Sequence, residues 1–492
     1  MHSHLPIIYV RGYAGTADAV ESAVSCPYYG FNEGSAKVRT GPDGDPELYL
    51  FESPMIRLMK DHGYSDLFVR IDRGRVFLLK PTEKESYPEK SLWVFRYYDD
   101  TSEDIGSGTR HRIETLGRQL TQVIDYVRQK TGADKVHLVA HSMGGLVCRS
   151  AIQKTMKKTK AKAKAKIARL FTYGTPHGGI HFRRGLGWAS WLRDILGPNH
   201  ADNFGPKEMR SYLGFPKNHP EERLNELGGQ LDPQRCFSFI GTNHDDYTVR
   251  MSKASVGPGS DGLVMLRHAY VKGSNRAFAH RSHSGPYGIV NSEEGYQNLQ
   301  RFLFGDTAVK ITLKKVRPKT SIRKRNDGAE LKTVVVEAAL GLRAEAVQLT
   351  EQLQRDGSAQ PVAMSTLEKG EETLFHAFLM KSRRPNGRFR YSQFQLQIRI
   401  VPIYTKDHWL SSESSYAGQA IFATSLFAAV GDPDNKGKRK VKVAWGSMED
   451  ALDKGNEFEI AQNSASFEID LPTNEQWIDS GKLVFEVHPW EV

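Results

Sequence analysis

Cysteine, long apolar runs and an apolar leader are all scarce or absent in this chain of 492 residues. The three cysteines, Cys26, Cys148 and Cys236, are too few and too far apart for a disulfide framework or a cysteine-based zinc site. No stretch approaches the roughly 20 consecutive apolar residues that a membrane-spanning helix needs. The apolar run Leu5–Val10 is too short for a signal peptide, and Arg11 follows it directly. We therefore expect a protein that is cytoplasmic or is exported by a route without an N-terminal signal peptide.

Positive charge is concentrated in two segments of the chain. Residues 154–169 and 310–325 hold eight Lys or Arg each and no acid, and without these sixteen cations the formal net charge of +11 becomes −5. Such segments favour either a phosphate-rich surface, such as an anionic membrane, or simple solvation. Because the rest of the chain is not basic, we do not expect a nucleic-acid-binding protein.

Residues 1–306 alternate short apolar runs with amphipathic stretches, which is typical of a mostly parallel sheet covered by helices. The runs that we interpret as buried strands are Ile7–Val10, Leu92–Tyr97, Val136–Ala140, Leu170–Tyr173 and Phe237–Ile240. Between the second and the third, apolar residues recur every three or four positions from Ile113 to Val127, which predicts an amphipathic helix ending at Gly132. A further helix is predicted over residues 293–304.

The pattern changes after residue 306 to an alternation of apolar and polar residues with a period of two. Residues 309–313, 441–445, 467–471 and 483–487 all alternate in this way. Within 389–400 the alternation slips by one position, which predicts a β-bulge. We therefore expect an all-β sandwich of about eight strands over residues 307–492, as a second domain after a first domain of residues 1–306.

The segment from Val136 to Arg149 combines a short strand, a tight turn and the start of a helix around Ser142. Small residues lie two positions before and two positions after this serine, at Ala140 and Gly144. A nucleophile on a strained strand-to-helix turn needs such neighbours, because larger side chains would collide there. The helix N-terminus also supplies positive potential for a developing oxyanion.

Three motifs resemble those of bacterial lipases of the α/β-hydrolase superfamily and follow one another in the same order as in that family. They are the opening strand and loop PIIYVRGYAGT, the nucleophile turn AHSMGG and the segment GTPHGG. The resemblance covers about residues 5–304 and implies an α/β-hydrolase fold with Ser142 as the nucleophile. It also implies an oxyanion hole formed by the backbone N–H groups of Tyr13 and Met143. Arg11 stands where the family usually has a histidine, so we expect this arginine to pack the loop or to anchor an acidic group.

The resemblance implies a catalytic acid after a late strand. Asp261, in the segment SDGLV, matches the position of the family's acid, which a G-x-V pattern typically follows. Asp245 and Asp246 follow the predicted strand Phe237–Ile240 and are the alternatives.

The family's catalytic base precedes its last helix. His283, in the segment HRSHSG, matches that place, and His280 and His268 are near enough in sequence to be alternatives. In the resulting triad the histidine takes the proton of the serine, and the aspartate sets the tautomer of the histidine.

Residues 180–235 interrupt the α/β alternation where lipases carry a cap or lid. Apolar residues spaced by three and four positions form one helical face there, which either roofs an acyl pocket or packs within the cap: Trp188, Trp191, Leu192 and Ile195. His177 and His181 lack the surrounding ligand residues of a zinc motif, so we predict no metal site.

We therefore predict a serine carboxylic-ester hydrolase of the lipase or esterase type, acting on an apolar acyl ester without any cofactor. One alternative is a phospholipase that acts on anionic membranes through residues 154–169 and 310–325, and a secreted effector is one form of it. The others are an acyltransferase with the same triad, and a catalytically silent scaffold whose role is binding.

Overall fold

The computed structural model describes most of the chain. The described ranges are residues 4–12, 17–31, 35–40, 45–79, 84–104, 106–158, 162–180, 204–246, 259–343, 347–359, 361–383, 391–406, 414–432, 434–436, 438–460, 465–473 and 477–490. The chain divides into two compact units. The first comprises mainly Met1–Arg276 and His280–Leu303, and the second mainly Ala277–Ala279 and Phe304–Glu491.

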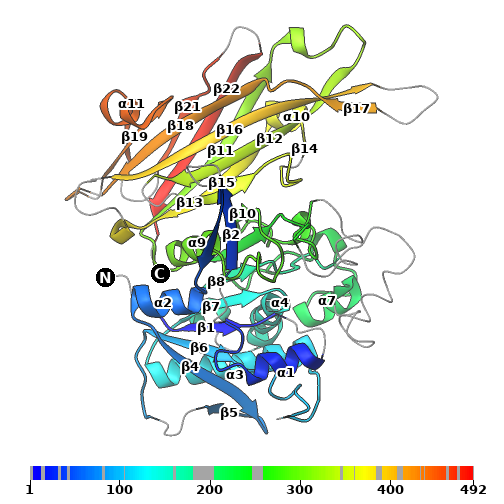
Figure 1. Cartoon of the computed structure of the whole chain (residues 1–492), viewed down its shortest axis with the longest axis vertical. Helices are drawn as coiled ribbons and strands as arrows, with labels where there is room; N and C mark the ends of the chain where they lie inside the picture. Colours follow the sequence, from blue (N-terminus) through cyan, green and yellow to red (C-terminus); the bar gives the residue numbers. More distant parts are fainter. Residues whose placement is uncertain are drawn as a thin grey trace. The chain divides into compact units, whose positions relative to one another are not determined.

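An eight-stranded sheet forms the centre of the first unit, in the order β10-β9-β8-β7-β1-β6-β4-β5 (Figure 1). Its strands are β1 (Ile7–Val10), β4 (Ser65–Asp72), β5 (Arg75–Leu78), β6 (Ser91–Phe95), β7 (Val136–His141), β8 (Ile167–Tyr173), β9 (Cys236–Gly241) and β10 (Asn275–Ala279). The neighbours from β4 to β9 pair in parallel, whereas β5 pairs antiparallel with β4. Strands β1, β6, β7, β8 and β9 are buried almost throughout, as expected for parallel strands covered on both faces.

Helices accompany this sheet. They are α1 (Ala17–Ser25), α2 (Pro54–His62), α3 (Ile113–Thr131), α4 (Met143–Ser150), α5 (Ala163–Lys166), α7 (Pro206–Leu213) and α9 (Glu293–Phe304). The predicted apolar stripe from Ile113 to Val127 is the buried face of α3, and Gly132 ends that helix in the left-handed conformation. The helix predicted over 293–304 is α9. A separate ribbon pairs β2 (Ser35–Thr40) with β3 (Pro46–Phe51).

The second unit contains two sheets of antiparallel strand pairs, one of four strands and one of eight. The first sheet consists of β11 (Thr307–Pro318), β15 (Glu371–Leu379), β21 (Ala465–Asp470) and β22 (Ile478–Pro489). The second consists of β12 (Glu330–Leu342), β13 (Val347–Gln352), β14 (Pro361–Ala363), β16 (Tyr391–Lys406), β17 (Ser414–Ala417), β18 (Phe422–Gly431), β19 (Arg439–Trp445) and β20 (Asn456–Ile460). Two short helices, α10 (Met364–Lys369) and α11 (Met448–Asp453), interrupt the strands. Buried apolar side chains of both sheets form a single hydrophobic cluster.

Two details of the sequence interpretation of this unit are wrong. The strands outnumber the eight expected, because short edge strands such as β14 and β17 carry no clear alternation. The predicted bulge is also absent from the described part of its range, since β16 pairs with β18 without a register shift from Tyr391 onward. The predicted bulge depends on Tyr391 being buried. Tyr391 lies on the less buried face of β16, whereas Ser392 and Phe394, at even positions, are buried.

Several described cations of the two basic segments form ion pairs with acidic residues. The ion pairs of residues 310–325 are Lys310–Glu486, Lys314–Glu371, Lys319–Asp479, Arg323–Glu368 and Lys324–Glu330. In residues 154–169, Lys154 pairs with Glu114 and Lys166 with Asp125. Binding of these segments to a membrane stays a prediction. None of the described helices is long and apolar enough to span a bilayer.

Candidate active site

Ser142 lies on the sharp turn between β7 and α4, in a strained backbone conformation with φ 50° and ψ −125°. A positive φ is costly for a residue with a side chain, and it persists here because neighbouring contacts hold the turn. The Ser142 N–H donates to the Tyr173 carbonyl at 2.8 Å, and the Thr175 hydroxyl donates to the Ser142 carbonyl at 2.9 Å. Gly144 is required because a Cβ there would collide with the Val10 and Arg11 carbonyl oxygens.

A chain of hydrogen bonds joins Ser142, His283 and Asp261. The Oγ of Ser142 lies 3.0 Å from Nε2 of His283, whose Nδ1 lies 2.7 Å from Oδ2 of Asp261. All three residues are buried, with 8%, 3% and 1% of their surface exposed. The aspartate accepts one ring N–H of the histidine, so the other ring nitrogen is left to accept the serine proton.

The loops that carry the acid and the base also hold each other. The His283 N–H donates to the Asp261 carbonyl at 2.8 Å. The second carboxylate oxygen of Asp261, Oδ1, accepts the N–H groups of Leu263 and Val264 at 3.0 and 2.8 Å. Both oxygens of this buried carboxylate therefore have partners, and its orientation toward His283 is fixed.

The alternatives for the acid and the base lie elsewhere. The side chain of Asp245 is 71% exposed, and the carboxylate of Asp246 accepts from the Asn243 amide at 2.5 Å. His280 is exposed, with Nδ1 3.5 Å from the Thr242 hydroxyl. His268 lies beside its neighbour Arg267, with 3.0 Å between Nε2 and the arginine Nε.

Two tyrosines hold the loop that follows β1 against the nucleophile turn. The Tyr97 hydroxyl donates to the Arg11 carbonyl at 2.8 Å and lies 3.1 Å from the Gly12 carbonyl, to which the Tyr98 hydroxyl also donates. Burial raises the pKa of the Tyr97 hydroxyl well above its usual range, so it stays a neutral donor. Sequence inspection missed this pair, because the contacts join residues 85 and 86 positions apart.

The two predicted oxyanion donors differ in how far the structure describes them. Met143 is the first residue of α4, where backbone N–H groups have no acceptor within the helix. Tyr13 lies outside the described residues, as do the predicted lid residues Trp188, Trp191, Leu192 and Ile195. The described end of the cap region, from residue 204, contains α7 and two short 3₁₀ turns, η4 (Glu221–Arg223) and η5 (Pro233–Arg235).

Arg149 connects α4, the helix that follows Ser142, to the described part of residues 180–235. The fully buried guanidinium donates to the carbonyls of His177, Leu224 and Glu226 at 2.6 to 2.8 Å. Burial lowers the pKa of Arg149 to about 10, which still leaves it charged at neutral pH. His177 is itself buried and 3.0 Å from the Thr172 hydroxyl. Among the described residues, no group of His, Cys, Asp and Glu is arranged to hold a metal ion.

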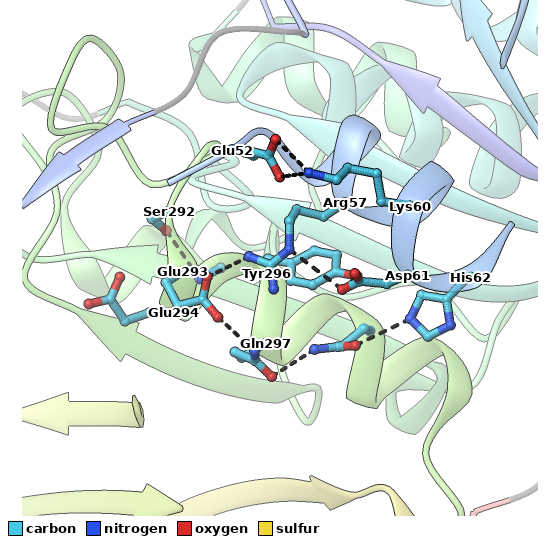
Figure 2. A network of polar contacts seen from close by, with 12 residues as sticks. Glu52, Arg57, Lys60, Asp61, His62, Ser292, Glu293, Glu294, Tyr296 and Gln297 are labelled. Carbon is cyan, nitrogen blue, oxygen red and sulfur yellow. Dashed lines mark hydrogen bonds and ion pairs between the residues drawn. The ribbon is translucent and has the colours of Figure 1, made fainter. Parts of the chain in front are cut away.

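A polar network links α2 to the start of α9, just after the loop that bears His283 (Figure 2). Arg57 forms an ion pair with Glu293 at 2.6 Å and lies over the Tyr296 ring, 4.1 Å from its centroid. The Tyr296 hydroxyl donates to Asp61 at 2.8 Å. Glu294 forms a buried ion pair at 3.0 Å with Arg281, which lies two residues before His283 in the chain. The network thus fixes the loop of the histidine at its α9 end.

Comparison with known protein families agrees with this arrangement. Residues 79–197, which include Ser142, match the model of a family described as "Putative serine esterase (DUF676)". The parallel sheet of the first unit and its serine turn after β7 are consistent with an α/β-hydrolase fold. The family match covers about a quarter of the chain and indicates an enzyme of the hydrolase type. A search of curated proteins finds no match.

Two solved structures illustrate the likeness, which is distant. A gene product of Listeria innocua is 12% identical with a TM-score of 0.34, over 61% of this chain and 94% of that one. The phospholipase PlaB of Legionella pneumophila is 11% identical with a TM-score of 0.34, over 84% of this chain and 89% of that one. Values this low carry no inference about activity.

Proposed function

We propose that the protein is a serine carboxylic-ester hydrolase of the lipase or esterase type, with Ser142, His283 and Asp261 as its catalytic triad. The observation that carries the proposal is the hydrogen-bond chain through the strained turn, with 3.0 Å from Ser142 to His283 and 2.7 Å from His283 to Asp261. A binding scaffold has no need for a buried serine at positive φ beside a paired histidine. The preferred substrate is an apolar acyl ester.

The reaction has two halves. The Oγ of Ser142 attacks the ester carbonyl carbon while Nε2 of His283 takes its proton, and the N–H groups of Met143 and Tyr13 hold the oxyanion. The tetrahedral intermediate breaks the bond to the alcohol, which leaves with the proton from His283. Water then loses a proton to His283 and attacks the acyl carbon, so the acid is released and Ser142 regains its proton. An acceptor alcohol in place of water would give acyl transfer.

The proposal also assigns a role to each of the two parts of the chain. Residues 1–306 act as the catalytic domain, and residues 307–492 form a β-sandwich that serves as an accessory domain. The hydrophobic cluster shared by the two sheets of the second unit supports a sandwich.

The test is hydrolysis of an acyl series by the wild type and by Ser142→Ala. The series runs from short soluble esters to long-chain triacylglycerol, with phosphatidylglycerol liposomes alongside. We expect the wild type to hydrolyse these esters, with turnover that rises with acyl chain length. The Ser142→Ala variant should show no such turnover. Equal activity of both proteins would refute the serine mechanism, and a preference for the liposomes would favour the phospholipase alternative.

A further inference from the structure

A cavity of about 620 Å³ is lined in part by His141, whose ring centroid lies 5.0 Å from that of His283. Its described lining comes from the end of β1 at Arg11, from the turn at residues 30–31, from His141 and from the loop over residues 284–291. His141 directly precedes Ser142 in the chain, and the loop directly follows His283. An ester whose carbonyl lies at Ser142 therefore has this cavity within reach of its other end.

Arg11 brings to the cavity a positive charge that has no acidic partner among the described residues. Nη1 of Arg11 donates to the Tyr29 carbonyl, and the guanidinium lies over the Tyr29 ring, 5.9 Å from its centroid. Within the described residues no carboxylate lies within ion-pair distance of it. Arg57 and Arg281, by contrast, each have a glutamate partner. A guanidinium carries several N–H donors, and a single carbonyl acceptor leaves most of them for a ligand.

The turn beside Arg11 is shaped for the guanidinium. Tyr29 and Gly30 both have a positive φ, 58° and 73°, which costs free energy at Tyr29. This conformation presents the Tyr29 carbonyl to Arg11, and a Cβ at Gly30 would collide with the guanidinium. Strain of this kind is retained where the surrounding structure requires it.

The other polar groups in the lining are neutral. Nε2 of His141 lies 3.0 Å from the His283 carbonyl, and burial, together with the nearby charges of His283 and Arg11, lowers the pKa of His141 to about 3. His141 is thus uncharged at neutral pH. The Oδ1 of Asn291 is buried without a hydrogen-bond partner among the described residues, and rotation of the amide presents its NH₂ group instead. Arg11 is therefore the charged residue of the described lining.

We propose that this cavity binds an anionic oxygen group, a phosphate or a carboxylate, carried by the ester that Ser142 attacks. The inference rests on the proposed esterase function and narrows its substrate class to acidic esters. The Arg11 guanidinium holds the acid by charge-assisted hydrogen bonds, and the Asn291 amide adds a neutral donor. The head group of an acidic phospholipid and the acid of a small soluble ester share this chemistry.

Two matched pairs of soluble substrates test the proposal. The first pair, 1-butanoylglycerol 3-phosphate and 1-butanoylglycerol, differs by a phosphate on the alcohol side. The second, mono-4-nitrophenyl glutarate and its methyl ester, differs by a carboxylate on the acyl side. In at least one pair the wild type should prefer the acidic member in kcat/KM. Arg11→Gln should lower that preference about 10- to 100-fold, mainly by raising KM for the acidic member.

Three companion variants separate a ligand contact from a structural role. Arg11→Lys should keep part of the preference, because it keeps the charge. Asn291→Leu should lower the preference for the acidic substrate and leave the hydrogen bond from Arg11 to the Tyr29 carbonyl intact. Arg118→Gln, on the exposed face of α3, removes a matched charge away from the cavity and should change nothing.

Binding to the Ser142→Ala protein separates failure of the cavity proposal from failure of the esterase proposal. Calorimetric titration with 1-butanoylglycerol 3-phosphate should give a dissociation constant at least tenfold weaker when Arg11→Gln is added. An enzyme that hydrolyses both pairs with equal preference before and after Arg11→Gln would overturn the cavity proposal alone. A protein that hydrolyses no ester, yet binds the phosphate through Arg11, would overturn the esterase proposal alone.

Vesicles distinguish the two sources of the acid. Phosphatidylglycerol preferred over phosphatidylcholine, with the preference lost in Arg11→Gln, identifies a lipid head group as the ligand. A preference confined to the soluble pairs identifies a small acidic ester. A preference for phosphatidylglycerol vesicles that survives Arg11→Gln, with none in the soluble pairs, reflects surface charge and contradicts the proposal.

Discussion

The carboxyl end of β7 in the first unit and the shared core of the second unit bury their side chains in opposite ways. Around β7 the buried set is polar and hydrogen-bonded, with Ser142, His283 and Asp261 in one chain. The shared hydrophobic cluster of the second unit, from Val309 to Val487, consists of hydrophobic side chains, and buried polar side chains such as Glu337 and Arg439 are not part of it. Because buried polar groups cost free energy, a fold keeps them where they perform a task. The difference agrees with the proposal that the chemistry belongs to the first unit, whereas the cluster of the second unit contributes stability.

Asp261→Asn, in the polar site of the first unit, should have the largest effect on activity. The amide no longer holds the productive tautomer of His283, so kcat for a short soluble ester should fall about 10⁴-fold with little loss of folded protein. Asp245→Asn, at the exposed alternative, is the control and should stay within about twofold of the wild type. An Asp261→Asn enzyme with most of its activity would remove this aspartate from the site.

Phe485→Ala should have the converse effect in the second unit. Phe485 is fully buried and stacks on Phe467 at 5.0 Å between ring centroids. Its truncation should lower the free energy of unfolding by about 3–5 kcal/mol. Urea denaturation followed by fluorescence measures this loss, and kcat per folded molecule should not change. A fall in kcat without a loss of stability would show that the second unit takes part in the chemistry.

Tyr98→Phe should produce an intermediate effect within the first unit. It removes a donor from the Gly12 carbonyl and frees the peptide group next to the predicted oxyanion hole. We expect kcat to fall about 10- to 100-fold with KM nearly unchanged. Tyr64→Phe is the matched control, since its buried hydroxyl donates to the Leu5 carbonyl at 2.9 Å. Equal losses in both variants would indicate a structural role only.

Lys314→Gln should have the smallest effect. This lysine of the second basic segment pairs with Glu371 at 2.7 Å, and the two side chains are 30% and 52% exposed. Such pairs contribute less than about 1 kcal/mol, so unfolding and turnover of a neutral soluble ester should barely change. A clear fall in that turnover would show that an ion pair of the second unit affects catalysis, which contradicts the assignment of the chemistry to the first unit.

The sequence predicts the central strands and the nucleophile turn well, because a buried parallel strand is a continuous apolar run. The predicted Ile7–Val10 is β1, and Val136–Ala140 lies within β7. It does not predict β4 and β5 near the sheet edge, where charged residues interrupt the apolar ones. The short edge strands β14 and β17 of the second unit were missed because they carry no clear alternation of apolar and polar residues.

In the candidate site, what could be predicted depended on local motifs, and what could not depended on distant contacts. The places of Ser142, Asp261 and His283 follow from short motifs. The roles of Tyr98 and Arg149 depend on contacts 86 and 75 residues away, which no local pattern encodes.

The most direct test of the account is covalent labelling with a fluorophosphonate, followed by mass spectrometry of the labelled peptide. The reagent reacts with a serine only where a base activates it and an oxyanion hole stabilises the adduct. We predict stoichiometric labelling at Ser142, none in Ser142→Ala, and slow labelling in Asp261→Asn. A folded wild-type protein that stays unlabelled, or that carries the label on another residue, would contradict the serine mechanism.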